Sequence, residues 1–329
     1  MIDTLRYTRF QPISRLLTSL LVFTLTFTGC KNKANEIALP VPRTIPELLS
    51  SNGKFTLLSA ALNRAGLATT LAGAGPFTLF APTDDAFRAA GFADAAAINA
   101  APVATLTNIL QYHLINGSVA GSAIATGQTA QATALATNGT VYFSKAASTT
   151  GGVGLSINEG RVVQADVLAS NGMVHVIDRV LMPPTGNILA VAQADTSLSL
   201  LVALINRAGP DIIKTLSGPG PITVFAPTNM ALRLDGISDT TAIKQAQVTA
   251  ITSILTNHVI PGVRAYSPTL LNGTAITTAG GGSLTITTGT GNALGIKSRG
   301  NGTVIPKVIA PGITVTNGVI NKIDRVLLP

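Results

Sequence analysis

The chain has 329 residues, enough for two domains of ordinary size that each bury a core of their own. Its 22 Lys and Arg outnumber 14 Asp and Glu, but the basic residues are scattered singly. Proteins that track nucleic-acid phosphates gather such residues in runs or stripes, so we do not expect nucleic acid as a partner. Aromatic residues are only 4% of the chain and Trp is absent, which argues against an aromatic platform for stacking sugars.

The first 29 residues are predicted to be a lipoprotein signal peptide. Three arginines precede an apolar, Thr-containing stretch of 13 residues, Leu16 to Thr28. This stretch is shorter than the roughly 20 residues that a helix needs to span a bilayer core. The only cysteine, Cys30, follows in a setting that resembles a bacterial lipobox, so we expect it to be lipidated and to hold the chain on a membrane. A plain signal peptide with an incidental cysteine is the alternative.

Lys31, rather than Asp, follows Cys30. By resemblance to lipoproteins of Gram-negative bacteria, this fits an exported protein anchored to the outer membrane or the cell surface, if the host has two membranes. Residues 30–43 are polar and proline-rich and predict an extended tether.

Helical spacing of apolar residues predicts a helix from Ile45 to about Leu71, with Gly66 as its C-terminal stop. The same pattern recurs at 198–205, followed by Gly209.

A short apolar strand, Phe77 to Phe80, follows the first helical segment. Pro82 ends this strand, and Thr83 can then accept a backbone N–H as the cap of a new helix. Residues 222–228 repeat the same order of strand, proline break and threonine. The shared segment therefore has a mechanical explanation that requires no ligand.

A further helix is predicted at 103–112 and again at 248–257, with His113 and His258 at the two C-terminal ends. A histidine there suits the helix dipole. We expect each ring to tie its helix end to a neighbouring backbone carbonyl; a catalytic base is the alternative. The rest of each copy is predicted to form short strands, with Asn-Gly pairs in the hairpin turns.

The copies are in one register. Phe80 and Phe225 are 145 positions apart, as are His113 and His258, and the closing blocks are offset by 146 at Asp178. A period this long indicates two tandem domains rather than a solenoid, whose repeats are about 20–50 residues long.

These blocks resemble the fasciclin domain family. Its pattern is a Phe-Ala-Pro-Thr segment near the start, a central pair such as Tyr112-His113, and a closing block like that at 171–183. The resemblance implies an α+β fold of two tandem domains, each a twisted β-wedge or sandwich with packed helices. We place the domain boundaries as follows: signal peptide 1–29, tether 30–43, first domain 44–183, linker 184–190 and second domain 191–329.

No catalytic or metal-binding constellation stands out. The three histidines, His113, His175 and His258, are not part of a zinc-protease motif, and a lone cysteine cannot form a cysteine metal site. The nucleophile elbow and the phosphate-binding loop are also missing from the sequence. We therefore expect no cofactor, no metal and no enzymatic activity.

The expected function is that of a membrane-anchored adhesion or interaction protein that binds a matrix, glycan or protein partner. A small-molecule or lipid-binding exported module is the second hypothesis, and a hydrolase of an exported polymer is the third. In animal relatives the region of the Tyr-His pair is proposed to contact adhesion receptors, so Tyr112 and His113 are the candidate interaction surface. The binding surface is otherwise expected where the copies disagree. Three such pairs are Tyr112 and Asn257, His175 and Asn321, and Asp85 and Met230.

Overall fold

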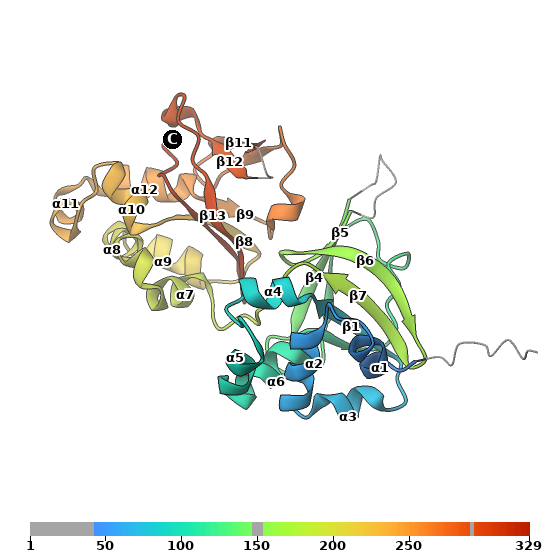
Figure 1. Ribbon diagram of the computed structural model, residues 1–329. Coiled ribbons are helices and arrows are strands. Elements are labelled where there is room, and N and C mark those ends of the chain that lie inside the picture. The colour runs from blue at the N-terminus through green and yellow to red at the C-terminus, as the bar shows by residue number, and fades with distance from the viewer. Residues whose placement is uncertain (1–42, 147–153, 290–292) are drawn as a thin grey trace, which may run out of the picture. The chain divides into compact units, whose positions relative to one another are not determined.

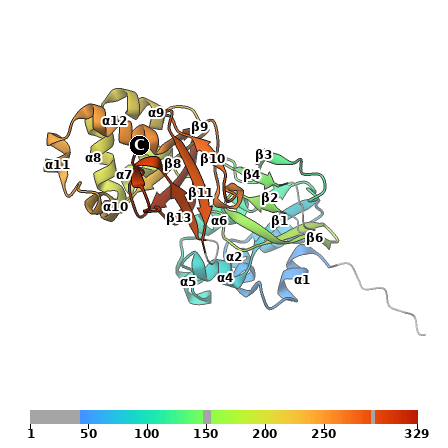
Figure 2. The ribbon, with the colours of Figure 1, turned by 90° about the horizontal axis from the view of Figure 1, so that it is seen from above.

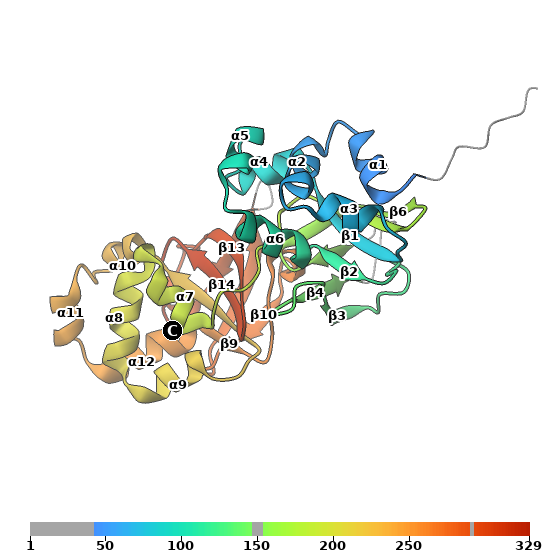
Figure 3. The same cartoon turned by 90° about the horizontal axis from the view of Figure 1, so that it is seen from below.

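A computed structural model describes residues 43–146, 154–289 and 293–329. The predicted signal peptide, Cys30 and the predicted tether up to residue 42 lie outside the described residues. We call residues 44–183 the first half and residues 184–329 the second half. Within each half the helices lie to one side of the strands (Figures 1, 2 and 3).

The first half has six described helices, then mostly strands. In chain order these are α1 (Ile45–Ser50), α2 (Thr56–Arg64), α3 (Leu67–Ala72), β1 (Phe77–Pro82), α4 (Asp84–Ala89), α5 (Ala95–Ala100), α6 (Val103–Tyr112), β2 (Leu114–Asn116), β3 (Gly127–Ala132), β4 (Thr140–Lys145), β5 (Leu155–Ile157), β6 (Gly160–Ala169) and β7 (Gly172–Ile177).

The second half repeats this order with added short 3₁₀ segments. Its elements are α7 (Ile188–Ala194), η1 (Thr196–Leu198), α8 (Ser199–Ala208), α9 (Pro210–Ser217), β8 (Ile222–Pro227), α10 (Asn229–Leu234), α11 (Thr240–Gln245), α12 (Val248–Asn257), β9 (Val259–Pro261), η2 (Ser267–Thr269), β10 (Ala275–Thr277), β11 (Ser283–Thr288), β12 (Leu294–Lys297), η4 (Arg299–Asn301), β13 (Val308–Val315) and β14 (Gly318–Ile323). Helix α7 begins inside the segment that the sequence assigns to the linker.

A parallel strand pair recurs in each half. In the first half β1 pairs in parallel with β7, within a seven-stranded sheet of order β2-β1-β7-β6-β5-β4-β3. In the second half β8 pairs in parallel with β14, within a sheet of order β13-β14-β8-β9, beside a separate sheet β10-β11-β12. The halves are therefore mixed α+β structures, as the family resemblance implies, and they share the same parallel pairing.

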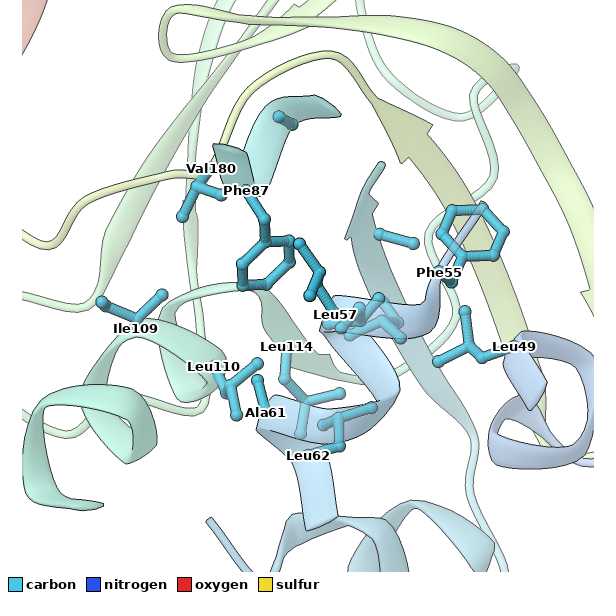
Figure 4. Packing of buried hydrophobic residues seen from close by; sticks show 14 of the residues in the cluster. Leu49, Phe55, Leu57, Ala61, Leu62, Phe87, Ile109, Leu110, Leu114 and Val180 are labelled. Atoms are coloured by element: carbon cyan, nitrogen blue, oxygen red, sulfur yellow. The ribbon is translucent and has the colours of Figure 1, made fainter. Parts of the chain in front are cut away.

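The core explains why β1 is apolar apart from the buried Thr78. In β1, Leu79 and Ala81 pack with the helices, whereas Phe80 between them packs into a second cluster on the opposite face of the sheet. Both faces are thus buried, as in strands covered on two sides. On the helical side Leu57 of α2, Phe87 of α4 and Leu110 of α6 lie close together (Figure 4).

The prediction of one continuous helix over 45–71 is wrong. The chain forms three helices there, because the turn after Ser50 and the left-handed Gly66 (φ 71°) each interrupt the backbone pattern. Gly66 does end the second of them, as expected, but it also starts α3. The apolar residues keep a helical spacing across both breaks, because all three helices pack their apolar residues into the same core.

The caps and turns follow the sequence more closely. Thr83 and Thr228 accept the N–H groups of Ala86 and Ala231, both at 3.3 Å, which confirms their predicted capping role. A two-residue hairpin turn does join β6 to β7, but it consists of Ser170 and Asn171 rather than of the Asn-Gly pair, since Gly172 is already the first residue of β7.

Among the described residues no single helix is long and apolar enough to cross a membrane. One helix pair, 188–194 with 196–208, meets the length and composition requirement together, across a bend of 103°.

Candidate interaction site

His113 and His258 are buried pins at the C-terminal ends of α6 and α12. In His113 the Nδ1 atom lies 2.7 Å from the carbonyl oxygen of Ile109, and Nε2 accepts the N–H of Leu181 at 2.9 Å. An accepting Nε2 requires the proton to be on Nδ1, which then donates to Ile109. The expected tie between helix end and backbone carbonyl is confirmed, and the ring has a second bond to the segment after β7.

His258 repeats the arrangement. Its Nδ1 lies 2.8 Å from the Ile254 oxygen, and its Nε2 accepts the N–H of Leu327 at 2.9 Å. Burial lowers the pKa of both histidines to about 4, so both are neutral near pH 7. A ring with both nitrogens engaged and no access to solvent is a structural group and cannot act as a general base toward an external substrate.

Tyr112, the other residue of the candidate interaction surface, lies in the interior with 0% exposure. Its hydroxyl donates to the Thr140 carbonyl at 2.8 Å and accepts from the Asn158 side chain at 3.0 Å. The side chains of Tyr112 and His113 therefore face the core, and an interaction through this segment remains a prediction that would have to use its exposed neighbour Asn116 or the backbone.

The counterpart of Tyr112 in the second half is also buried. Asn257 is 3% exposed, and its amide nitrogen donates to the Leu327 carbonyl at 2.9 Å and to the Ser298 hydroxyl at 3.2 Å. The difference between Tyr112 and Asn257 is a difference between two ways of filling and bonding the core.

His175 and Asn321, which occupy equivalent positions in the two halves, make closely similar hydrogen bonds. The Nδ1 atom of His175 accepts the N–H of Asp166, and Nε2 lies 2.8 Å from the Val119 carbonyl. The amide of Asn321 accepts the N–H of Gly312 and donates to the Ala265 carbonyl.

Asp166 and Gly312 both have positive φ and lie in the bulged segments of β6 and β13. The two side chains thus accept from a bulge residue and donate to a neighbouring loop, and both are almost completely buried. The expectation that these positions belong to a binding surface is wrong, because polar side chains here satisfy backbone groups of the interior.

Of the three differing pairs, only Asp85 and Met230 lie on the surface. Met230 of α10 is 70% exposed, whereas Asp85 of α4 is paired with Arg88 at 2.7 Å. The preceding residues, Asp84 and Asn229, are a further compensated pair: each side chain accepts the N–H of the second residue of the helix it caps, Leu57 in one half and Leu200 in the other.

Asn171 and Asn317 are structural residues, whereas their Asn-Gly pairs in the sequence predict only turns. The Asn171 side chain accepts the N–H of Ile45 and donates to the carbonyls of Leu71 and Gly73, which joins the start of α1 to the end of α3. Asn317 does the same between α7 and α9. Their recurrence before Gly in both closing blocks was the signal, but it was equally consistent with a turn.

Asp178 and Asp324 follow the last strand of each half and also bind backbone. Their carboxylates accept the N–H groups of Arg161 and Lys307, at 2.8 Å and 2.6 Å. Among the described residues no group of three or more His, Cys, Asp or Glu is placed to hold a metal ion.

The cavity between helices and sheet in the second half is small and apolar. It has a volume of about 20 Å³ and is lined by core residues such as Leu201 and Leu255, with His258 at its edge. Sites for small molecules are typically about 300–1,000 Å³. This space can hold little more than one water molecule.

The halves differ most in charge. The first half has six Lys and Arg against seven Asp and Glu, a net charge of −1, whereas the second half has ten against five, a net charge of +5. Three of these ten make side-chain contacts inside the second half: Lys322 pairs with Asp195, Arg207 donates to the Lys244 carbonyl, and the buried Arg264 donates to the carbonyls around 315–318.

Comparisons with known proteins agree with the duplication. The family model described as the fasciclin domain matches residues 53–183 and again residues 196–329. The chain is 36% identical over 159 residues to protein sll1483 of Synechocystis, which covers 46% of this chain and 79% of that protein.

Two further relatives show how widely the pattern occurs. The chain is 29% identical over 312 residues to the transforming growth factor-beta-induced protein ig-h3 of Sus scrofa, which covers 93% of this chain but 41% of the relative. It is 36% identical over 133 residues to the immunogenic protein MPB70 of Mycobacterium bovis, covering 40% of this chain and 62% of that protein. A solved FAS1 domain pair from the insect cell adhesion molecule Fasciclin I is 20% identical, with 86% of this chain and 95% of that chain covered and a TM-score of 0.41.

Proposed function

Because the chain belongs to the fasciclin domain family, we propose that it is an exported adhesion or interaction protein that binds a matrix, glycan or protein partner through its two domains. Members of the family are non-enzymatic adhesion or secreted proteins, and this chain is not an enzyme. Homologues are secreted or extracellular proteins, which supports export of this one.

The use of the recurring polar residues carries the proposal. These side chains form hydrogen bonds with the backbone of their own half; they are His113, His258, Asn171 and Asn317. A family pattern whose polar residues are bonded to backbone in this way specifies the fold. Partners are then recognised by other residues, which lie on the surface. The small apolar cavity of the second half does not favour the alternative of a ligand bound between helices and sheet.

Anchoring through a lipid on Cys30 is part of the proposal, and it is motivated by the sequence alone. Replacing Cys30 with Ser should release the protein from the membrane fraction, and globomycin should block its processing. A Cys30→Ser protein that is still processed and remains membrane-bound would refute the lipid anchor without touching the adhesion function.

The adhesion function has its own test. A strain that lacks the protein should attach less to surfaces and form less biofilm, and expression of the full chain should restore attachment. Unchanged attachment, together with no binding of the purified full chain to polysaccharide or matrix-protein arrays, would contradict the proposal.

A further inference from the structure

Part of the excess positive charge of the second half lies in a loop that is longer than its counterpart in the first half. In the first half Ser156 of β5 pairs with Arg161 of β6, and four residues connect them. In the second half the corresponding pair is Gly295 and Lys307, and eleven residues connect them. The added loop contains Lys297 and Arg299 and no acidic residue, whereas the short connection in the first half contains Glu159.

The strand pairing places two of these cations, Lys297 and Lys307, on one face, and Arg299 follows Lys297 by two residues. Gly295 and Lys307 oppose each other, and side chains of opposed residues lie on the same face of a sheet. Lys297 is two residues beyond Gly295 in β12 and therefore shares that face. Lys297, Arg299 and Lys307 are all exposed, while Ser298 between the first two is buried.

The loop that carries Arg299 is fixed to the body of the second half. The amide of Asn301 donates to the Val326 carbonyl at 2.8 Å and accepts the N–H of Leu328 at 3.0 Å. Gly300 donates to the Leu328 carbonyl. The cations therefore stand on a preformed surface, and a ligand does not have to order this loop when it binds.

Hydroxyl groups continue the same face across the neighbouring strands. Thr285 of β11 is opposite Lys297, and Ser283 is opposite Thr277 of β10. The alternating residues Leu284 and Ile286 point into the core, so these hydroxyls lie on the outer side, with Ser283 and Thr277 exposed. We call Lys297, Arg299, Lys307, Ser283, Thr285 and Thr277 the basic hydroxyl face.

Other charges around this face are few. Asp324, half-buried, binds the Lys307 backbone N–H, and Arg325 follows it in the chain. Asp235 accepts the N–H of Val326, whose carbonyl accepts from Asn301 of the loop, so this carboxylate also lies nearby. The three exposed cations and Arg325 against Asp235 and Asp324 leave a local charge of +2 among the described residues.

We propose that the basic hydroxyl face binds an acidic polysaccharide. Carboxylate or sulfate groups would pair with the three cations, and sugar hydroxyls would exchange hydrogen bonds with the Ser and Thr side chains. An anionic membrane is the less favoured occupant, because the strands beside the lysines present mainly hydroxyls on this face. Ile305, which lies against Gly295, and Val304 are the exposed apolar side chains of the loop, at 42% and 51%. The inference rests on the proposed function and names its ligand class and the half that carries it.

The test compares two full-length variants with the same net charge. The face variant is Lys297→Gln, Arg299→Gln, Lys307→Gln. The control variant is Arg207→Gln, Lys214→Gln, Lys244→Gln, which removes three exposed cations from helices α8, α9 and α11 of the same half. Unfolding of each variant is measured first, and both should match the native protein because exposed side chains are changed.

Binding is measured to alginate, to heparin, to neutral dextran and to vesicles of phosphatidylglycerol and phosphatidylcholine, at several salt concentrations. We expect salt-sensitive binding of the native chain to at least one acidic polysaccharide and none to dextran. The face variant should bind about tenfold more weakly, since an exposed ion pair contributes roughly a factor of two to three, and the control variant should stay within about threefold of native.

Three outcomes would overturn the inference: equal losses in both variants, equal binding to dextran and acidic polysaccharide, or binding to the vesicles alone. If the native chain binds no acidic polysaccharide while bacterial attachment still depends on the protein, this inference fails and the adhesion function stands. Loss of attachment dependence itself would instead remove the proposed function.

Discussion

The two halves of the chain differ in one way in the interior and in another way at an exposed loop. In the interior a difference in residue type is matched by a similar set of hydrogen bonds, as between His175 and Asn321. No such matching occurs between β5 and β6 and their counterparts: a short, buried connection containing Glu159 in one half is replaced by a longer loop with the exposed Lys297 and Arg299 in the other. Divergence under burial therefore preserves the fold, and divergence at the surface is where the copies acquired different properties.

The largest expected effect is the loss of a buried histidine pin. His113→Ala leaves the buried N–H of Leu181 without its acceptor and opens a cavity, so it should lower the stability of the first half by about 3 kcal/mol or more. Hydrogen exchange of the full chain, followed by mass spectrometry, should show faster exchange in residues 44–183 only.

Asp94→Ala is the matched control, because Asp94 caps the exposed helix α5 through the Ala97 N–H. It should cost about 1 kcal/mol. Similar losses from the two changes would show that His113 does not pin the core, and faster exchange in both halves would show that its effect is not confined to one copy.

Acid should destabilise both halves through the same histidines. In the unfolded chain a histidine has a pKa near 6.5, whereas His113 and His258 in the folded chain have a pKa of about 4. The unfolded state therefore binds more protons below pH 6.5. Full stability is present above about pH 6.5 and is lost as pH falls toward 4, by on the order of 3 kcal/mol for each histidine. Urea unfolding at a series of pH values measures this slope.

The double variant His113→Gln, His258→Gln separates this effect from other titrations. It should be less stable than the native protein at pH 7, but its stability should change much less between pH 6.5 and 4. An unchanged slope would mean that other groups cause the acid sensitivity.

A smaller effect is expected where an asparagine joins two helices. Asn171→Asp replaces the nitrogen that donates to the Leu71 and Gly73 carbonyls with an oxygen that repels them, which should cost about 2 kcal/mol. Asn317→Asp should have the same effect in the second half. The control Asn138→Asp changes an exposed turn residue with φ of 57°, which Asp also adopts, and should shift the unfolding midpoint little. Equal effects at the three positions would contradict the bridging role.

The sequence predicted the features that depend on local chemistry. Thr83 as a cap, His113 as a tie at a helix end, and the duplication follow from residue type and register, whereas the α+β fold class came from the family resemblance. The breaks within 45–71 were missed because helices packed on one core keep a common apolar spacing across a turn.

The burial of the residues that differ between the halves was not predictable from the sequence. Tyr112 and His175 are polar, and the sequence alone does not show that they hydrogen-bond to the carbonyls of Thr140 and Val119 in the interior. The charge difference between the halves was countable from the sequence, but the pairing of Gly295 with Lys307 was needed to place the cations on one face.

The central claim is that buried differences between the copies are structural equivalents and carry no recognition. The most direct measurement is made on the full-length variant His175→Asn, which gives the first half the residue of the second. Asn can accept from Asp166, and its shorter side chain donates to Val119 once that loop moves slightly inward, so the cost should be about 1–2 kcal/mol, from this shift and from lost packing against Phe80. Binding of the folded variant to the matrix or glycan partner should equal that of the native chain. A variant that unfolds like the native protein but no longer binds would contradict the claim.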